Sequence, residues 1–258
     1  MARNRSESGR RYAAHWDKIA PRWGEEVFNT LLAARNRVVV AELKTAARSS
    51  RSIVDFGCGI GTYLPMLSRL FEEVHGFEQS PKCVRIAKSK MRGRSNVTVR
   101  VAHRVTKETR SRYDAALCVN VAIHPSKREW RQVLRSLFVM LGPGGRLLLV
   151  VPSLESGALV ARAQELDADT EDVAPAPSDR MRARIQGGIV RFGGVPTKHF
   201  QQKELRAALV GLGLEAVRLR RVEYSWASHG ITPAREFKTA RPWDWLAVAR
   251  KPGNAKTS

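Results

Sequence analysis

The stretch SIVDFGCGIGTYL, residues 52–64, constrains the fold of this chain most strongly. A short apolar run leads directly into Gly57, Gly59 and Gly61. Glycine permits unusual backbone angles and lets a ligand approach the main chain without meeting a Cβ. The helical pattern that follows carries Pro65 in its first turn, where a missing N–H costs little. We therefore predict a buried strand, a turn shaped for ligand contact and a helix with free N–H donors.

The rest of the chain continues this rhythm of strand and helix. Further strands are predicted at 73–78, 97–102, 113–120, 146–152, 214–226 and 243–250. Helices are predicted at 62–71, 80–91, 127–141 and 202–213. Alternation of this kind predicts an α/β fold with helices on both faces of a mostly parallel sheet. The last two strands have no helix between them, so we expect an antiparallel pair at the sheet edge. The expected architecture is a doubly wound, Rossmann-like sheet of seven strands with an antiparallel last strand.

Composition shifts suggest four parts. Residues 1–11 are expected to form a flexible basic arm, and 12–154 the N-terminal helices with the ligand-binding core. The helical pattern of 12–47 is broken by Pro21 and then runs on from 25 to 47. Residues 155–197 have an acidic, proline-bearing middle and no clean strand, which favours a lid inserted between strands 5 and 6. Residues 198–258 complete the fold.

Charge is the unusual bulk property, because 45 Lys and Arg against 24 Asp and Glu give a net charge of +21. The run from Lys82 to Arg112 could attract nucleic acid, or could be a solvated basic surface. The three cysteines form no CxxC pair, which argues against a disulfide framework or a zinc site. We expect no metal. No apolar stretch reaches the roughly 20 residues of a membrane span, and the start lacks the apolar core of a secretory signal. A reducing cytoplasm is the expected location.

The spacing of the glycines narrows the range of ligands that the loop could bind. Dinucleotide-binding proteins use G-x-G-x-x-G, whereas this chain has G-x-G-x-G. Asp55 inside the motif is awkward beside a pyrophosphate but suits a ligand that carries an ammonium and a sulfonium. Glu78 ends the next predicted strand, where a carboxylate can accept both hydroxyl hydrogens of a ribose.

Four segments in order, VDFGCGIGTYL, GFEQSPKCVRIAK, YDAALCVNVAIH and LGPGGRLLLVVP, resemble the successive motifs of class I S-adenosylmethionine-dependent methyltransferases. The resemblance covers about residues 10–154, and 198–250 more loosely. It implies an enzyme with S-adenosylmethionine as cofactor and S-adenosylhomocysteine as product. A degenerate fold that has lost its cofactor is the alternative, and the intact glycines and Glu78 argue against it.

The resemblance also implies residue roles. The loop Asp55, Gly57, Cys58, Gly59 and Gly61 would face the methionine moiety, and Glu78 would hold the ribose, with Gln79 beside the adenine. The family often has an acidic residue after the third strand, where this chain has Ala102, His103 and Arg104. His103 or Arg104 would contact the adenine, or main chain would serve instead.

Further roles fall on the fourth strand and the first helix. Asn120 and Val121 would lie along the methionine. Tyr12 and Trp16 would cover its carboxylate, or pack as an ordinary amphipathic helix. His124 is the candidate general base, or a histidine that packs or caps at a helix start.

The acceptor is expected to be a small molecule, of unknown O, N or C acceptor atom, beneath the N-terminal helices and the lid. Aromatic side chains would supply its walls, although each also fits ordinary packing; His199 could also point inward. The aromatic candidates are Tyr224, Trp226, His229, Trp243 and Trp245. The alternative is an RNA methyltransferase that uses the basic surface; a motif of the base-amino methylating enzymes is missing after the fourth strand, where NVAIHP stands. A cofactor-binding scaffold without turnover is a third hypothesis.

Overall fold

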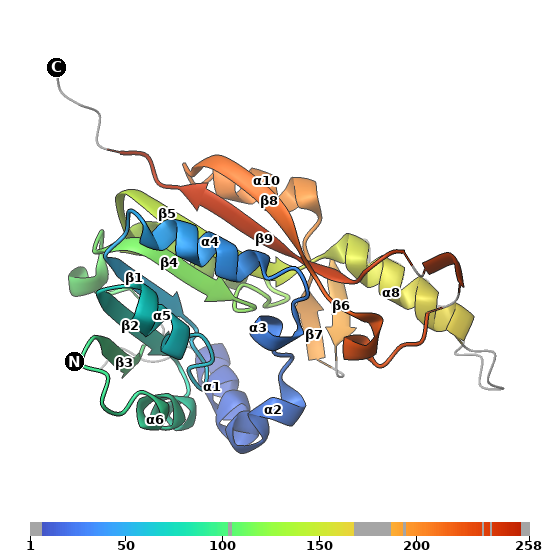
Figure 1. The fold of residues 1–258 in the computed structure, drawn as a ribbon, viewed down its shortest axis with the longest axis horizontal. Coiled ribbons are helices and arrows are strands. Elements are labelled where there is room, and N and C mark those ends of the chain that lie inside the picture. The colour runs from blue at the N-terminus through green and yellow to red at the C-terminus, as the bar shows by residue number, and fades with distance from the viewer. Residues whose placement is uncertain are drawn as a thin grey trace.

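β1 (Ser52–Phe56) is an inner strand of a seven-stranded sheet, and all five of its residues are buried. The structure is a computed structural model and describes residues 7–102, 105–167, 187–192, 195–233, 235–237 and 239–253. The strand order is β3-β2-β1-β4-β5-β9-β8 (Figure 1). The other strands are β2 (Glu73–Glu78), β3 (Val97–Val101), β4 (Tyr113–Val119), β5 (Leu141–Pro152), β8 (Glu215–Glu223) and β9 (Trp243–Arg250).

The predicted fold is confirmed, since β3, β2, β1, β4 and β5 run parallel and β9 pairs antiparallel with both β5 and β8. The last strand therefore lies between β5 and β8, and β8 forms the edge. Strand β5 begins five residues earlier than expected, at Leu141, because the Gly-Pro-Gly-Gly segment is part of the strand.

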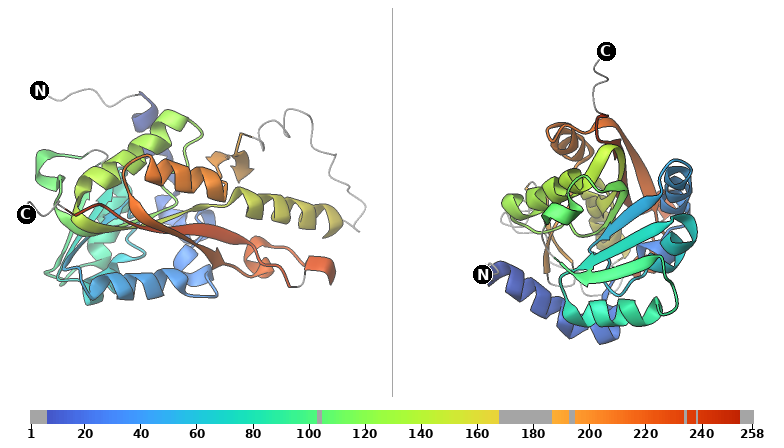
Figure 2. Two further views of the ribbon diagram at one scale, coloured as in Figure 1. Left: turned by 90° about the horizontal axis from the view of Figure 1, so that it is seen from above. Right: turned by 90° about the vertical axis from the view of Figure 1, so that its left-hand side faces the viewer.

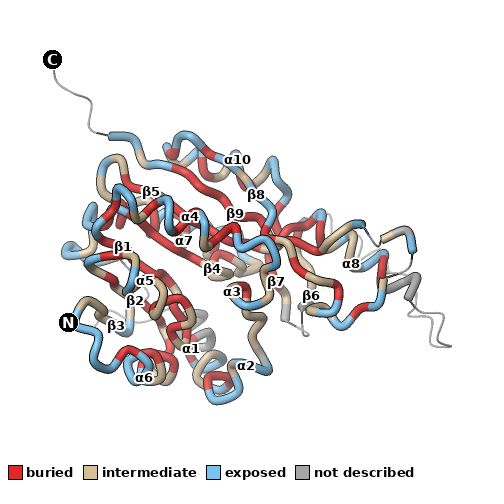
Figure 3. The backbone as a smooth tube through the Cα atoms, in the orientation of Figure 1, coloured by how far each residue is buried: buried red, intermediate tan, exposed pale blue. Residues whose placement is uncertain are grey.

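Two apolar layers enclose the sheet (Figure 2). One layer packs α4 (Val38–Ala47), α5 (Leu64–Leu70) and α6 (Pro81–Lys90) on one face. The other packs α7 (Lys127–Met140) and α10 (Gln202–Val210) on the opposite face. Figure 3 shows that the buried backbone follows the central strands, while the turns and outer helix surfaces are exposed.

The N-terminal region differs from the expected long helix. It consists of α1 (Glu7–Ile19), α2 (Trp23–Glu26), α3 (Thr30–Ala33) and α4, and α1 begins inside the stretch expected to be an arm. The prediction of one helix over 25–47 is wrong for two local reasons. The Asn29 side chain accepts a hydrogen bond from the Leu32 N–H and so starts a new helix, and Arg37 takes a left-handed backbone with φ 46°.

The insertion also contains regular structure. Helix α8 (Leu154–Asp167) follows β5, and β6 (Ile189–Phe192) pairs antiparallel with β7 (Val195–Lys198). The prediction of no strand here is therefore wrong. Two four-residue strands after a glycine give too short an apolar run to be recognised. The predicted lid at 155–197 includes residues 168–186, which lie outside the described residues.

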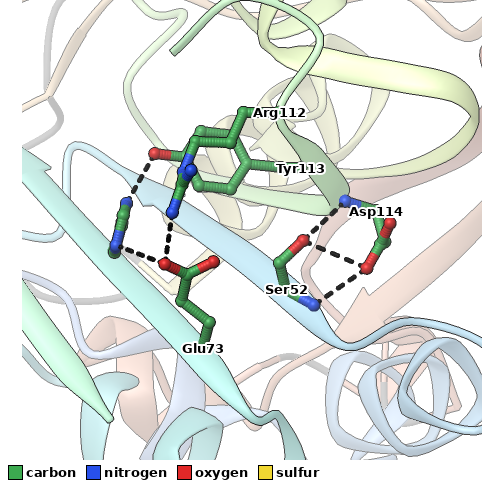
Figure 4. Close-up of polar contacts among 6 residues, drawn as sticks. Ser52, Glu73, Arg112, Tyr113 and Asp114 are labelled. Atoms are coloured by element: carbon green, nitrogen blue, oxygen red, sulfur yellow. Dashed lines mark hydrogen bonds and ion pairs between the residues drawn. The ribbon is translucent and has the colours of Figure 1, made fainter. Parts of the chain in front are cut away.

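A polar network connects the amino ends of β1, β2 and β4, at the edge of the sheet away from the glycine loop (Figure 4). Asp114 Oδ2 accepts hydrogen bonds from the main-chain N–H groups of Arg51 and Ser52 at 2.8 and 2.9 Å. His75 Nδ1 lies 2.7 Å from the Tyr113 hydroxyl. In the part of the chain that the structure describes, no helix is long and apolar enough to cross a membrane.

Candidate functional site

The loop after β1 is held in backbone conformations that favour glycine. Gly57, Gly59 and Gly61 have φ values of 79°, 54° and 81°. A side chain at Gly57 or Gly59 would also collide with a neighbour, and one at Gly61 would pack tightly against Ala87 and Leu64. A Cβ on Gly59 would lie 2.5 Å from the Trp23 ring, and one on Gly57 would overlap Val121. The glycines are thus required both by backbone angle and by close approach.

Asp55, at the end of β1, is buried with 3% of its surface exposed. Its Oδ2 is buried without a hydrogen-bond partner among the described residues. Burial, together with the charge of Glu78, raises the pKa of Asp55 to about 7. A buried carboxylate that lacks a partner is costly unless a cation or a donor reaches it. The residue therefore fits a cationic ligand.

Glu78 ends β2 and turns toward the glycine loop. One oxygen accepts the Gly59 N–H at 3.1 Å and the other accepts the Ser80 N–H at 2.8 Å. Burial raises the pKa of Glu78, against the opposing effect of these N–H groups. A carboxylate has about four acceptor positions, so capacity for ligand hydroxyl groups remains.

The sequence analysis missed Asp17 on α1. Its Oδ1 accepts hydrogen bonds from the Ser80 hydroxyl at 2.5 Å and from the Lys82 N–H at 3.0 Å. Burial opposes ionisation of Asp17, but these donors and the charges of Arg85 and Lys82 outweigh it and lower the pKa. The negative charge lies at the start of α6, where the helix dipole favours it. Asp17 thereby fixes α1 beside the end of β2.

Trp23 is the second residue that the sequence analysis missed. Its ring lies on Gly59, and the Trp16 ring lies 5.6 Å from it between centroids. The predicted Trp16 is thus near the loop through Trp23, and its carbonyl accepts a weak hydrogen bond from the Cys83 thiol. The Tyr12 backbone belongs to α1, but its side chain lies outside the described residues.

Asn120 and Val121 follow β4 directly, as predicted. Asn120 has φ 55°, an uncommon value for a residue other than glycine, and its buried Oδ1 has no partner among the described residues. Its Nδ2 lies 3.4 Å from the Thr30 hydroxyl of α3. The loop continues beside β7, because the Lys198 N–H donates to the Ile123 carbonyl.

The other predicted residues lie in different surroundings. Cys58 is buried, and burial together with Asp55 and Glu78 raises its thiol pKa, so the thiol stays protonated. Gln79 is half-buried beside Glu78. His124 is half-buried, and its Nδ1 accepts the Ser126 N–H just before α7. His103 and Arg104 lie outside the described residues.

The late aromatic residues divide into two groups. Tyr224 and His229 contact each other and Phe28, with the Phe28 and Tyr224 ring centroids 4.8 Å apart. Trp226 instead donates to main-chain carbonyls and packs in a separate cluster. Trp243 and Trp245 belong to the α7 and α10 layer. His199 is buried, with Nδ1 3.1 Å from the Thr197 carbonyl oxygen.

Asp244, at the start of β9, is a further residue that the sequence analysis missed. The Tyr224 hydroxyl donates to its Oδ2 at 2.7 Å. Burial raises the pKa of Asp244 to about 6, while Tyr224 and the Asn120 amide oppose the shift. Nothing in the local sequence WDWLAVAR sets this aspartate apart from any polar residue of a strand.

The loop fits an adenosyl ligand with an ammonium group. Asp55 Oδ2 lacks a donor among the described residues, and Glu78 has acceptor capacity left for hydroxyl groups. Among the residues that the structure describes, no group of three or more His, Cys, Asp and Glu side chains could hold a metal ion. This site, at the carboxyl edge of a sheet with this strand order, defines the class I methyltransferase fold.

A family model described as "Methyltransferase domain" matches residues 25–219, and the chain belongs to this family. The predictions of a class I methyltransferase, of an enzyme and of S-adenosylmethionine as its cofactor are confirmed. A search of curated protein sequences finds no match.

Solved structures share the fold at low sequence identity. The DhpI–SAH complex has 14% identity and a TM-score of 0.58, over 97% of this chain and 100% of that chain. A SAM-dependent methyltransferase from Methanosarcina mazei has 20% identity and a TM-score of 0.52, over 78% and 92%. A protein from a study of thioacetal formation during echinomycin biosynthesis has 20% identity and a TM-score of 0.56, over 85% and 82%.

Proposed function

We propose that this enzyme methylates a small molecule and releases S-adenosylhomocysteine. S-Adenosylmethionine supplies a methyl group on a positively charged sulfur, so the protein mainly has to position an acceptor in line with it. The observation that carries the proposal is the cover on the loop: Trp23, from the N-terminal segment, lies against Gly59. A glycine loop that is covered in this way suits a small methyl acceptor better than a polymer.

An open hollow of about 460 Å³ lies on the N-terminal segment next to Trp23, and no residue of the glycine loop lines it. Phe28 lines the hollow and also contacts Tyr224 and His229. The hollow is lined by Gly24, Glu25, Val27, Phe28, Asn29, Leu32 and Ala33.

The cofactor would be held by the chain's own groups. Glu78 would accept from the ribose hydroxyl groups, with Gln79 beside the adenine, and Asp55 would accept from the ammonium. Asn120 and Val121 would contact the methionine side. Trp16 and Trp23 would cover the cofactor. His124 would face the acceptor from the end of β4.

The proposal is tested with S-adenosylmethionine that carries a deuterated methyl group. The enzyme is incubated with a metabolite extract and, separately, with bulk RNA, and mass spectrometry locates the label. We expect label in a small molecule, and none after replacement of Glu78 by alanine at limiting cofactor. Label in RNA that resists 0.3 M salt would support the alternative acceptor, since weak phosphate contacts are lost with salt. Bound cofactor with no label anywhere would support the scaffold hypothesis.

A further inference from the structure

Two carboxylates lie on the same face of the sheet, and the cofactor accounts for one of them. Asp55 lies two residues from Ile53, and Asp244 lies two and four residues from Leu246 and Val248, so both carboxylates are on the sheet face that the α4 and α5 layer covers. The strands β4 and β5 lie between them, which corresponds to about 14 Å across the sheet. Both carboxylates therefore face the space above the ends of β4 and β5.

The register places Asp244 nearer the rim. Leu117 is level with Asp55, Leu148 is level with Leu117, and Val248 is level with Leu148. Asp244 comes four residues before Val248 and pairs with Pro152, the last residue of β5. Asp55 thus lies deep at the glycine loop and Asp244 lies at the outer edge, where an acceptor would enter.

Tyr63 connects the two carboxylates electrostatically. It is buried with 6% of its surface exposed, and its hydroxyl has no hydrogen-bond partner among the described residues. After burial, the charges of Asp55 and Asp244 both raise the pKa of Tyr63.

The partners of Asp244 are neutral. Tyr224 donates a hydrogen bond to it, the Asn120 amide stabilises its charge, and among the described residues no cation forms an ion pair with it. Asp244 as a residue is half-buried at the outer end of β9. A carboxylate in such surroundings favours a cationic partner.

The polar atoms near Asp244 that lack a hydrogen-bond partner among the described residues also favour a ligand that donates hydrogen bonds. Asn120 Oδ1 is buried without a partner, and a carbonyl oxygen can only accept. The Asp244 carboxylate also accepts. An ammonium offers three donors and a positive charge, which neither a hydroxyl group nor a carboxylate does. The Tyr224, Phe28 and His229 rings are in mutual contact beside the pair, and aromatic faces attract cations.

We propose that Asp244, oriented by Tyr224, binds a protonated amine on the methyl acceptor. The inference rests on the proposed function and adds the chemical class of the substrate. The amine serves as an anchor that orients the acceptor, and the methylated atom lies elsewhere on the same molecule, toward the glycine loop.

The test measures binding to the enzyme already saturated with S-adenosylhomocysteine. The probes are benzylamine, phenethylamine and 3-phenylpropylamine, each compared at pH 7.5 with the neutral alcohol of the same length. We expect at least one amine to bind about tenfold more tightly than its alcohol, because hydrogen bonds to charged groups give differences of this order. No preference in any pair would overturn the inference.

Variants of Asp244 and Tyr224 test whether these two residues cause the preference for an amine over an alcohol. Asp244→Asn should abolish it and leave the affinity for S-adenosylhomocysteine unchanged, and Tyr224→Phe should reduce it severalfold while the ring remains packed. Glu42→Gln is the matched control, since Glu42 is a buried carboxylate on α4 that already forms ion pairs with Arg218 and Arg220 of β8.

The outcomes separate the two proposals. If the wild-type enzyme does not bind S-adenosylhomocysteine, the proposed function fails. If it binds this compound but the amine preference persists in Asp244→Asn and Tyr224→Phe, the inference alone fails. A loss of S-adenosylhomocysteine affinity in Asp244→Asn would show that Asp244 serves the cofactor, which also contradicts the inference.

Discussion

The Glu78 carboxylate accepts a hydrogen bond from the Gly59 main-chain N–H over 3.1 Å, so the loop after β1 and the end of β2 form one unit. The same carboxylate holds the Ser80 N–H at the start of α6. One side chain therefore orders the glycine loop and presents acceptor oxygens beside it. The arrangement of the loop is built into the protein before any ligand arrives, which reduces the ordering cost of binding.

Gly59→Ala should destabilise the protein, because the left-handed backbone disfavours alanine and its Cβ would collide with Trp23. The backbone alone accounts for about 1–2 kcal/mol of unfolding free energy. In a Trp23→Ala background the added cost should fall toward that value, as measured by urea denaturation. Gly24→Ala is the control and should be near neutral, since a Cβ there meets nothing within 4 Å. If the losses of unfolding free energy caused by Gly59→Ala and Trp23→Ala were strictly additive, the contact between Trp23 and Gly59 would be contradicted.

Binding of S-adenosylhomocysteine should release protons at pH 6. Burial and Glu78 raise the pKa of Asp55 to about 7, so this carboxyl is mostly protonated at pH 6. An ammonium beside it favours the charged form and lowers that pKa, and the proton leaves. Calorimetry in buffers of different ionisation enthalpy should give about one proton at pH 6 and almost none at pH 8.5. Release that persists in Asp55→Asn would assign the proton to another group.

The ligand-free protein should show the matching effect on stability. A carboxyl with a raised folded-state pKa contributes stability below its unfolded value, near 3.8, and loses it as pH rises through about 7. Asp55→Asn should therefore flatten the fall in melting temperature between pH 4 and 7. An unchanged profile would show that Asp55 ionises freely in the folded chain.

Asp114→Asn should weaken the opposite edge of the sheet and spare the ligand site. Its carboxylate accepts from Arg51 and Ser52, and although burial opposes ionisation, these donors lower the pKa of Asp114. We expect a loss of about 1 kcal/mol at pH 7, because the group is partly exposed to solvent. The stability from a lowered pKa is present above the unfolded value and lost as pH falls, so the difference from wild type should vanish near pH 2. A changed affinity for S-adenosylhomocysteine would contradict the separation of the two edges.

His124→Ala tests the candidate general base. Burial lowers the pKa of His124, so the ring is neutral at pH 7 and able to accept a proton. If it acts as the base, turnover of the identified acceptor should fall about 100-fold or more while affinity for S-adenosylhomocysteine holds. Normal turnover with a lower melting temperature would assign the ring to the start of α7 through Ser126.

The strands and the glycine loop could be predicted because their signals are local. β2 and β9 begin and end at the residues expected from their apolar runs, and Gly57, Gly59 and Gly61 all take positive φ. A glycine's backbone freedom and a buried apolar run both depend only on residues that are neighbours in the sequence.

The rest of the candidate site depends on contacts between distant segments. Asp17 meets Ser80 across 63 positions of sequence, and Trp23 meets Gly59 only after the N-terminal helices fold over the sheet. Asp244 reaches Tyr224 because β9 pairs with β8 in the antiparallel edge pair that the sequence predicted, but the contact itself joins positions 20 residues apart. The breaks at Asn29 and Arg37 interrupt a helical pattern that has no proline or glycine to mark them.

The most direct test is a calorimetric titration of the wild-type enzyme and of Glu78→Ala with S-adenosylhomocysteine. We expect one site in the wild type, and an affinity weaker by about 1–3 kcal/mol in the variant, the usual cost of leaving buried polar partners unpaired. Thermal melting of Glu78→Ala must show a folded protein at the titration temperature. Equal affinities in two folded proteins would remove Glu78 from the cofactor site and contradict the account.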